Sequence, residues 1–214
     1  RLQFLALLPL QNPIRANAPK TFAYFAKQGV QVKVISGDDP RAVSRVAAQA
    51  GIAGAENWVD ASQLQNDREL ASAAAQATVF GRVTPEQKRK LVHALQAQSH
   101  TVAMTGDGVN DVLALKDADC GIAMASGAQA AAQVAQLVLL DSDFGALPAV
   151  VGEGRRVINN IQRSASLFLV KNIFSLLLSM VALCLPLAYP FKPLQLSLVS
   201  SVTIGIPSFI LALE

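Results

Sequence analysis

Two carboxylates and an amide lie in one short run of the sequence, Thr105-Gly106-Asp107-Gly108-Val109-Asn110-Asp111. The run follows an apolar stretch that ends at Met104 and opens a stretch with helical periodicity, which predicts a strand-to-helix turn. Such turns lie at the carboxyl edge of a parallel sheet, where open α/β proteins bind their ligands. The oxygens of Asp107 and Asp111 suit Mg²⁺ that holds a phosphate. The alternative is a surface turn in which an Asp caps the helix.

A hydroxyl and an ammonium group elsewhere in the sequence also have the chemistry of phosphate binding. Ser36 ends an apolar run and precedes Gly37 and Asp38, so its hydroxyl is placed to donate to a phosphoryl oxygen. Taken alone, a Ser before Gly-Asp is more often an ordinary turn or cap. Lys88 lies in a predicted helix that begins at Pro85, and its charge can offset that of a phosphate. The alternative for Lys88 is a solvated helix lysine.

The elements that must position these residues alternate along the first two thirds of the chain. The predicted strands cover residues 3–8, 30–35, 78–80, 101–104, 121–124 and 137–140. The predicted helices cover residues 19–28, 40–50, 70–77, 85–98 and 109–117, and we expect a surface loop around Trp58. This alternation predicts an α/β fold with a parallel sheet, covered by helices in right-handed crossovers.

The last third of the chain has the composition of a membrane segment. Hydrophobic residues make up 52% of the 214 residues, which is high for a soluble protein. An amphipathic helix at 146–164 runs into the apolar stretch 167–187, and a second apolar stretch follows at 194–213. Each apolar stretch is long enough to cross ~30 Å of hydrocarbon, which predicts a transmembrane hairpin. The alternative is a pair of buried helices in a large soluble core.

Basic residues near the first apolar stretch predict its orientation. Arg155, Arg156 and Arg163 precede this stretch, whereas the connection to the second stretch carries only Lys192. The positive-inside rule therefore places the sheet domain in the cytoplasm. Tyr189 lies where an aromatic residue of the membrane interface is expected.

Charge and cysteine usage exclude other classes of protein. The formal net charge is +3, but the basic residues are scattered and only 6% of residues are aromatic, so nucleic-acid binding is not expected. Cys120 and Cys184 lie in a predicted strand end and a predicted membrane helix, so we expect no disulfide between them and a reducing, cytoplasmic setting for the first part of the chain. His93 and His100 flank a helix end and are assigned no role.

Taken together, these motifs resemble those of P-type cation-transporting ATPases, membrane pumps whose phosphorylation domain belongs to the haloacid-dehalogenase-like superfamily. The run that ends at Asp111 is similar to the fourth motif of that superfamily. Ser36-Gly37-Asp38 is similar to the second motif, which usually reads Thr-Gly-Asp in the pumps. Arg82-Val83-Thr84-Pro85-Glu86-Gln87-Lys88 is similar to the stretch that carries the third-motif lysine.

The resemblance implies a role for each matching residue. Asp107 would bind Mg²⁺, and Asp111 and Asn110 would support that ion and the phosphoryl group. Ser36, in the second motif, would hydrogen-bond a phosphoryl oxygen. Lys88 would offset phosphate charge in the transition state.

The resemblance also implies an architecture and a set of partners. The fold would be a Rossmann-like, haloacid-dehalogenase-type parallel sheet domain followed by a transmembrane α-helical hairpin. Residues 1–145 would be the C-terminal part of the cytoplasmic phosphorylation domain, 146–166 a stalk helix, and 167–187 and 194–213 membrane helices. The partners would be ATP, Mg²⁺, a transported cation, the lipid membrane and the remaining domains of the pump. The protein would be a multi-pass protein of the plasma membrane.

Two features depart from the family pattern. Asn12-Pro13-Ile14-Arg15 resembles the Asp-Pro-x-Arg segment of the pumps, with Asn12 in place of Asp. The sequence Asp-Lys-Thr-Gly-Thr, which holds the phosphorylated aspartate of the family, does not occur. We therefore expect this chain to be a slice of a longer pump, without ATPase activity by itself. The alternatives are a soluble haloacid-dehalogenase-like phosphatase and a truncated membrane remnant without catalysis.

The resemblance extends to the ion pathway. It makes the two apolar stretches the fifth and sixth membrane helices. The residues at positions that commonly carry ion ligands are Asn172, Ser175, Ser200, Thr203 and Ile204. Ser175 and Ile204 replace carboxylates of calcium pumps, so a divalent-ion site of the familiar type is not expected. Lys171 is either a functional intramembrane cation, as in the gastric proton/potassium pump, or a lysine that extends to the interface.

Overall fold

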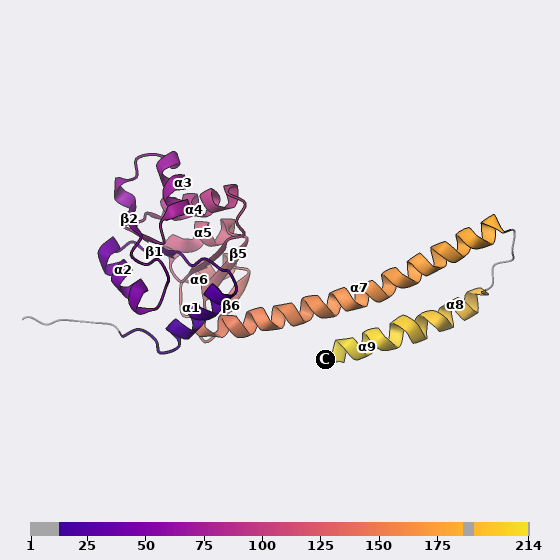
Figure 1. Ribbon diagram of the computed structural model, residues 1–214. Helices are drawn as coiled ribbons and strands as arrows, with labels where there is room; N and C mark the ends of the chain where they lie inside the picture. Colours follow the sequence, from indigo (N-terminus) through magenta and orange to yellow (C-terminus); the bar gives the residue numbers. More distant parts are fainter. Residues whose placement is uncertain (1–12, 186–190, 214) are drawn as a thin grey trace, which may run out of the picture. The chain divides into compact units, whose positions relative to one another are not determined.

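The computed structural model of the chain describes residues 13–185 and 191–213, without the side chains of residue 193 and residues 211–213 (Figure 1). The predicted strand at 3–8, Asn12, Tyr189 and the end of the first apolar stretch at 186–187 lie outside this part. The chain divides into two units, Arg1–Pro148 and Ala149–Glu214.

The first sheet of the N-terminal unit is parallel and is covered on both faces. Its strands are β1 (Val34–Ile35), β3 (Val79–Gly81) and β2 (Trp58–Asp60), in the order β1-β3-β2. Successive side chains of a strand point to opposite faces, and here both faces are buried. Phe80 packs in one core cluster with Leu70 and Leu91, whereas Val79 packs in another with Ala47. A parallel strand that is apolar on both faces is typical of a sheet between helical layers.

The predicted surface loop at Trp58 is wrong, because this residue begins strand β2. Trp58 pairs with Val79 and Val59 pairs with Phe80 in the parallel register. The strand lies at the edge of the sheet, and the Trp58 residue is 39% exposed. The guanidinium carbon of Arg41 lies 5.8 Å from the centre of the Trp58 ring. A strand of three residues is too short for its periodicity to identify it.

The second sheet is also parallel and carries the turn with the two carboxylates. Its strands are β4 (Ala103–Gly106), β5 (Cys120–Met124) and β6 (Leu137–Leu139), in the order β4-β5-β6. Its core contains Val92, Met104, Leu115 and small residues such as Ala123. The predicted α/β fold with parallel strands is confirmed.

Helices join the strands, as the alternation of patterns predicted. Those of the N-terminal unit are α1 (Ala18–Lys27), α2 (Pro40–Gln49), α3 (Asp67–Gln76), α4 (Pro85–Ala97), α5 (Val112–Asp117) and α6 (Gln129–Val134). Short 3₁₀ turns are η1 (Ala61–Gln63), η2 (Val109–Asp111) and η3 (Phe144–Ala146). Helix α4 begins with a capping box between Thr84 and Gln87, which places Lys88 at the end of its first turn.

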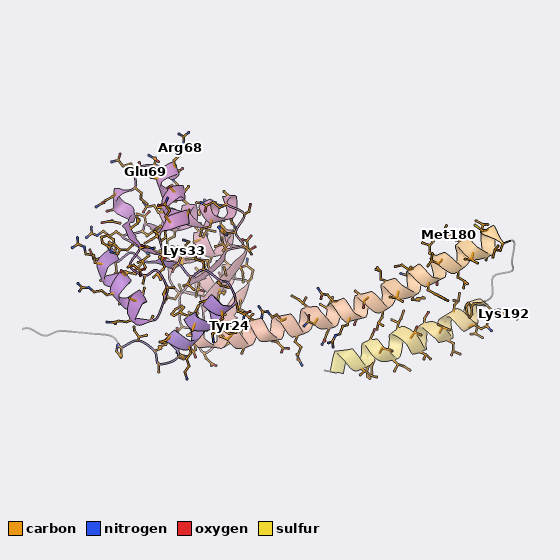
Figure 2. The ribbon with its side chains drawn as sticks, viewed as in Figure 1. Tyr24, Lys33, Arg68, Glu69, Met180 and Lys192 are labelled. Carbon is orange, nitrogen blue, oxygen red and sulfur yellow. The ribbon has the colours of Figure 1, made fainter. Side chains whose placement is uncertain are left out.

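The C-terminal unit is helical. Helix α7 runs from Leu147 to Cys184 without interruption, and its 38 residues correspond to roughly 57 Å of helix. The second apolar stretch forms α8 (Pro193–Ser200), a π-helical turn η4 (Ser201–Gly205) and α9 (Ile206–Leu213). Apolar side chains such as Met180, labelled in Figure 2, are exposed along α7.

Within the part that the structure describes, one helix is long and apolar enough to cross a membrane, at Phe144–Cys184. None of its apolar window is buried. The second apolar helix, Leu194–Ile210, has fewer than the 18 residues expected of a membrane-crossing helix. The first membrane span is therefore supported by the length and composition of α7, whereas the second span of the hairpin stays a prediction.

Candidate functional site

The turn after β4 is folded so that Asp111 lies against Gly106 and Gly108. The Asp111 carboxylate accepts the Gly108 amide at Oδ2 over 3.2 Å, and the Asp111 amide donates to the Gly108 carbonyl over 3.1 Å. A Cβ atom at Gly106 would lie 2.6 Å from Cβ of Asp111, so only glycine fits there. The tight turn therefore directs the Asp111 carboxylate back over the end of the strand.

Lys88 and Asp111 form a largely buried ion pair. Lys88 Nζ lies 2.6 Å from Asp111 Oδ1, and the two side chains are 13% and 10% exposed. The pair joins the first turn of α4 to η2, over 23 positions of sequence. Two residues that sequence analysis assigned to one site are thus in direct contact.

Asp107 is exposed, and its backbone is held by the loop after β5. The Asp107 carbonyl accepts the Ala128 amide over 2.7 Å. A Cβ atom at Gly127 would lie 2.4 Å from the same carbonyl oxygen. Gly127 and Ala128 were missed by sequence analysis, although a glycine shortly after an apolar strand is the signal that could have found them. Asn110 is exposed on the same turn.

The second predicted motif forms its own group at the end of β1. Ser36 Oγ donates to Asp38 Oδ2 over 3.1 Å and accepts the Asp38 amide over 3.2 Å. Among the described residues, no side-chain hydrogen bond or ion pair joins this group to Lys88, Asp107 or Asp111. Gly37 differs from Gly106 in the space around it, since a Cβ atom at position 37 would meet only the Val83 carbonyl at 4.0 Å. The structure therefore gives no steric reason for glycine at position 37.

Backbone hydrogen bonds nevertheless link the two groups through β3. The Ser36 amide donates to the Phe80 carbonyl over 2.9 Å, and the Val83 amide donates to the Ser36 carbonyl over 3.0 Å. Val83 directly precedes Thr84, the N-cap residue of α4. The position of Ser36 and the start of the helix that carries Lys88 are thus fixed by the same strand end.

Helix α4 is also fixed to α5 by polar contacts on Asp117. His93 Nε2 lies 2.8 Å from Asp117 Oδ2, and Gln96 donates to the Asp117 carbonyl over 2.9 Å. Arg89 forms a further ion pair with the same carboxylate. The hydrogen bond from Arg89, followed by that from His93, lowers the pKa of Asp117. These contacts hold α4, with Lys88, against the helix that follows the Asp107 turn.

The donor set fits Mg²⁺ bound together with a phosphate, and not a metal held by protein alone. The part of the chain that the structure describes contains no group of three or more His, Cys, Asp or Glu side chains placed to hold a metal. Mg²⁺ commonly takes one or two carboxylates and completes its shell with phosphate oxygens and water. The exposed Asp107 can supply such a ligand, while Asp111 is engaged by Lys88.

The predicted ion-pathway residues lie in the helices of the C-terminal unit. Ser200 Oγ donates to the Leu196 carbonyl and Thr203 Oγ to the Val199 carbonyl, each over 2.7 Å. Such bonds satisfy the hydroxyls within their own helix. Lys171, Asn172 and Ser175 lie on α7, and Ile204 is buried in the π-helical turn.

Ser208 was missed by sequence analysis. Its Oγ is buried and has no hydrogen-bond partner within the described part of the chain.

The family of the chain follows from its match to known sequences. The profile described as haloacid dehalogenase-like hydrolase matches residues 1–119. The chain belongs to this hydrolase family, in agreement with its parallel α/β fold and the turn that carries Asp107.

The chain of 214 residues is homologous to P-type cation-transporting ATPases over nearly its whole length. The chain is 52% identical over 98% of its length to a protein of Mycobacterium tuberculosis named calcium-transporting ATPase CtpE. It is 44% identical over 100% of its length to a probable cation-transporting ATPase, exp7, of Streptococcus pneumoniae. It spans 27% and 28% of those two relatives.

A solved structure gives the same result. The crystal structure of a zinc-transporting PIB-type ATPase in the E2.Pi state matches 94% of this chain and 28% of that one, with a TM-score of 0.68 and 25% identity. The predicted resemblance to P-type cation-transporting ATPases is confirmed.

Proposed function

We propose that this chain is part of a pump that couples ATP hydrolysis, through an aspartyl-phosphate, to the movement of a cation across a membrane. The observation that carries the proposal is the largely buried Lys88–Asp111 pair beside the exposed Asp107. A lysine held by a carboxylate at the edge of a parallel sheet is placed to meet phosphate charge. The relatives named as cation-transporting ATPases support the same function.

Each residue of the site has a separate task in phosphoryl transfer. Asp107 would hold Mg²⁺, with Asn110 and Asp111 beside it, and the ion would supply positive charge against the phosphoryl oxygens. Lys88 places a fixed positive charge against the phosphate. Ser36, released from Asp38, donates a hydrogen bond to a phosphoryl oxygen. The aspartate that accepts the phosphoryl group comes from a segment outside these residues, because Asp-Lys-Thr-Gly-Thr is absent from them.

Two observations bear on the transported ion: the name of a relative, and the residue types of the apolar helices. The relative that is 52% identical is named for calcium, so Ca²⁺ is the first ion to test. Residues 167–185 and 191–213 contain no Asp or Glu. A divalent ion therefore takes its carboxylate ligands from other helices of the pump, while Asn172, Ser175, Ser200 and Thr203 supply neutral oxygens.

The basic residues indicate which side of the membrane the sheet domain occupies. Arg155, Arg156 and Arg163 lie in the first half of α7, before the apolar stretch, which supports a cytoplasmic position for residues 1–145 in a plasma-membrane protein. A soluble phosphatase is less well supported, because α7 leaves large apolar side chains such as Phe168 and Leu169 exposed.

Phosphorylation of the assembled pump tests the proposal. Membranes that contain the full-length pump should incorporate radioactive phosphate from ATP into an acid-stable, hydroxylamine-sensitive form. Asp107→Asn should abolish this incorporation. The purified chain of 214 residues should turn over no ATP, and turnover that survives removal of contaminants would contradict the proposal.

A further inference from the structure

Arg82 holds an uncommon backbone conformation between β3 and α4. Its φ is +52°, in the left-handed region that few non-glycine residues adopt. Its amide donates to the Asp38 carbonyl over 2.8 Å. The residue therefore turns the chain from the strand end towards the N-cap Thr84 while it holds the loop after β1.

The guanidinium group of Arg82 links the other two strands of the same sheet. Nη1 lies 2.8 Å from Asp60 Oδ2, at the end of β2, and Nη2 lies 2.9 Å from Asp39 Oδ2, the N-cap of α2. A planar guanidinium can bind two carboxylates at once, which an ammonium group does less well. One side chain thus joins the carboxyl ends of all three strands of the first sheet.

The carboxylate at the centre of this arrangement is itself fixed. The Asp60 side chain is 8% exposed, and its Oδ1 accepts Ser62 Oγ over 2.6 Å and the Ser62 amide over 3.0 Å. The hydrogen bonds from Ser62, together with Arg82, lower the pKa of Asp60. These contacts favour the charged form of Asp60 beside Arg82.

Strand β3 and the start of α2 are in close contact at Gly81. A Cβ atom at Gly81 would lie 2.4 Å from Cα of Pro40, the first residue of α2. The largely exposed loop from Ser36 to Asp39 is therefore held by Arg82 at two points, its amide on the Asp38 carbonyl and its guanidinium on the Asp39 carboxylate. A change in the position of Arg82 must move that loop.

We propose that Arg82 is a positioning residue that sets Ser36 and Lys88 in the geometry for phosphoryl transfer. It acts through the loop after β1 on one side and through the start of α4 on the other. Both terminal nitrogens of its guanidinium group are engaged by carboxylates, so it orients the site and does not itself receive phosphate. This proposal rests on the proposed function, because it names the step that the orientation serves.

The test compares variants of the full-length pump. Arg82→Ala should lower the rate of phosphorylation from ATP by about 10²-fold, the loss expected when catalytic groups move by about 1 Å. The KM for ATP should change far less if Arg82 acts by holding the loop, because its guanidinium is engaged by Asp39 and Asp60. Arg82→Lys should recover part of the rate, since it keeps the charge but reaches one carboxylate. Arg41→Ala is the matched control, because Arg41 lies two residues after Asp39 but has its guanidinium over the Trp58 ring.

Two further variants separate the guanidinium from the backbone. Arg82→Gly relieves the strain of the positive φ, so a rate near that of the wild type would show that conformation alone matters and would overturn the proposal. Asp39→Asn removes one of the two ion pairs, and should give a smaller loss than Arg82→Ala in a pump that melts at the wild-type temperature. A rate for Arg82→Ala within twofold of the Arg41→Ala rate would also overturn the proposal.

A second measurement distinguishes failure of this proposal from failure of the proposed function. Amide hydrogen exchange at residues 82 and 83 should become about tenfold faster in Arg82→Ala, because the loop after β1 is released. Unchanged exchange at both amides overturns the positioning role whatever the pump transports. Absence of phosphorylation in the wild type overturns the proposed function, while the exchange result still decides whether Arg82 holds the loop.

Discussion

Removal of Lys88 should reveal how strongly the ion pair stabilises the first unit. Lys88→Met leaves the Asp111 carboxylate largely buried, with the Gly108 amide as its remaining hydrogen-bond donor. Breaking a buried pair on one side typically costs ~3–5 kcal/mol. The remaining amide bond and the partial exposure of the carboxylate reduce that cost, so we expect a loss of about 3 kcal/mol in the free energy of unfolding.

Urea unfolding of the detergent-solubilised chain measures this loss. Trp58 is the only tryptophan of the sequence and lies in the first unit, so its fluorescence reports on that unit. The control is the double variant Lys88→Met/Asp111→Asn, which removes both charges but keeps an acceptor for the Gly108 amide. It should be more stable than Lys88→Met by about 2 kcal/mol, because no uncompensated charge is left. Equal stability of the single and double variants, or a loss below about 1 kcal/mol in the single variant, would refute the reasoning.

Three further predictions concern the turn, the helix pair and the membrane helix. Gly127→Ala should cost about 1–3 kcal/mol of stability and lower the affinity for Mg²⁺ in calorimetry, because its Cβ would lie 2.4 Å from the Asp107 carbonyl oxygen. Asp117→Asn should destabilise the chain at pH 7 in thermal melting. The bond from Arg89 lowers the pKa of Asp117, so its stabilising effect is complete above the unfolded value of ~3.9 and disappears as the pH falls through the lower folded value. The two proteins should therefore converge in strong acid. Lys171→Ala in the pump should change the pH dependence of transport, and an unchanged profile would assign Lys171 to the membrane interface.

The strands and the turn could be predicted because their signals are local. Apolar runs such as residues 121–124 are long enough to be recognised, and Gly106 and Gly108 flank the acidic residue that they expose. Strand β2 could not be predicted, since its three residues take their conformation from pairing with β3. Helix α6 was also not predicted, and its six residues are rich in alanine with no marked apolar periodicity.

The partners within the site required the tertiary structure. Sequence analysis assigned Lys88 and Asp111 to one site, but their direct pairing joins residues 23 positions apart and follows from how α4 packs on η2. The same holds for Arg82, whose two carboxylate partners are 22 and 43 positions away. Such contacts depend on strand order, which the sequence pattern alone does not determine.

The two parallel sheets have a consequence for handling the chain in isolation. Within residues 13–185, β1 and β4 are each hydrogen-bonded to a neighbouring strand on one side only. An open strand edge offers backbone donors and acceptors to any other extended segment, and is a common starting point for aggregation. Expression of residues 13–185 alone would therefore present these edges to other copies, so pairing between copies is the form of aggregation to expect.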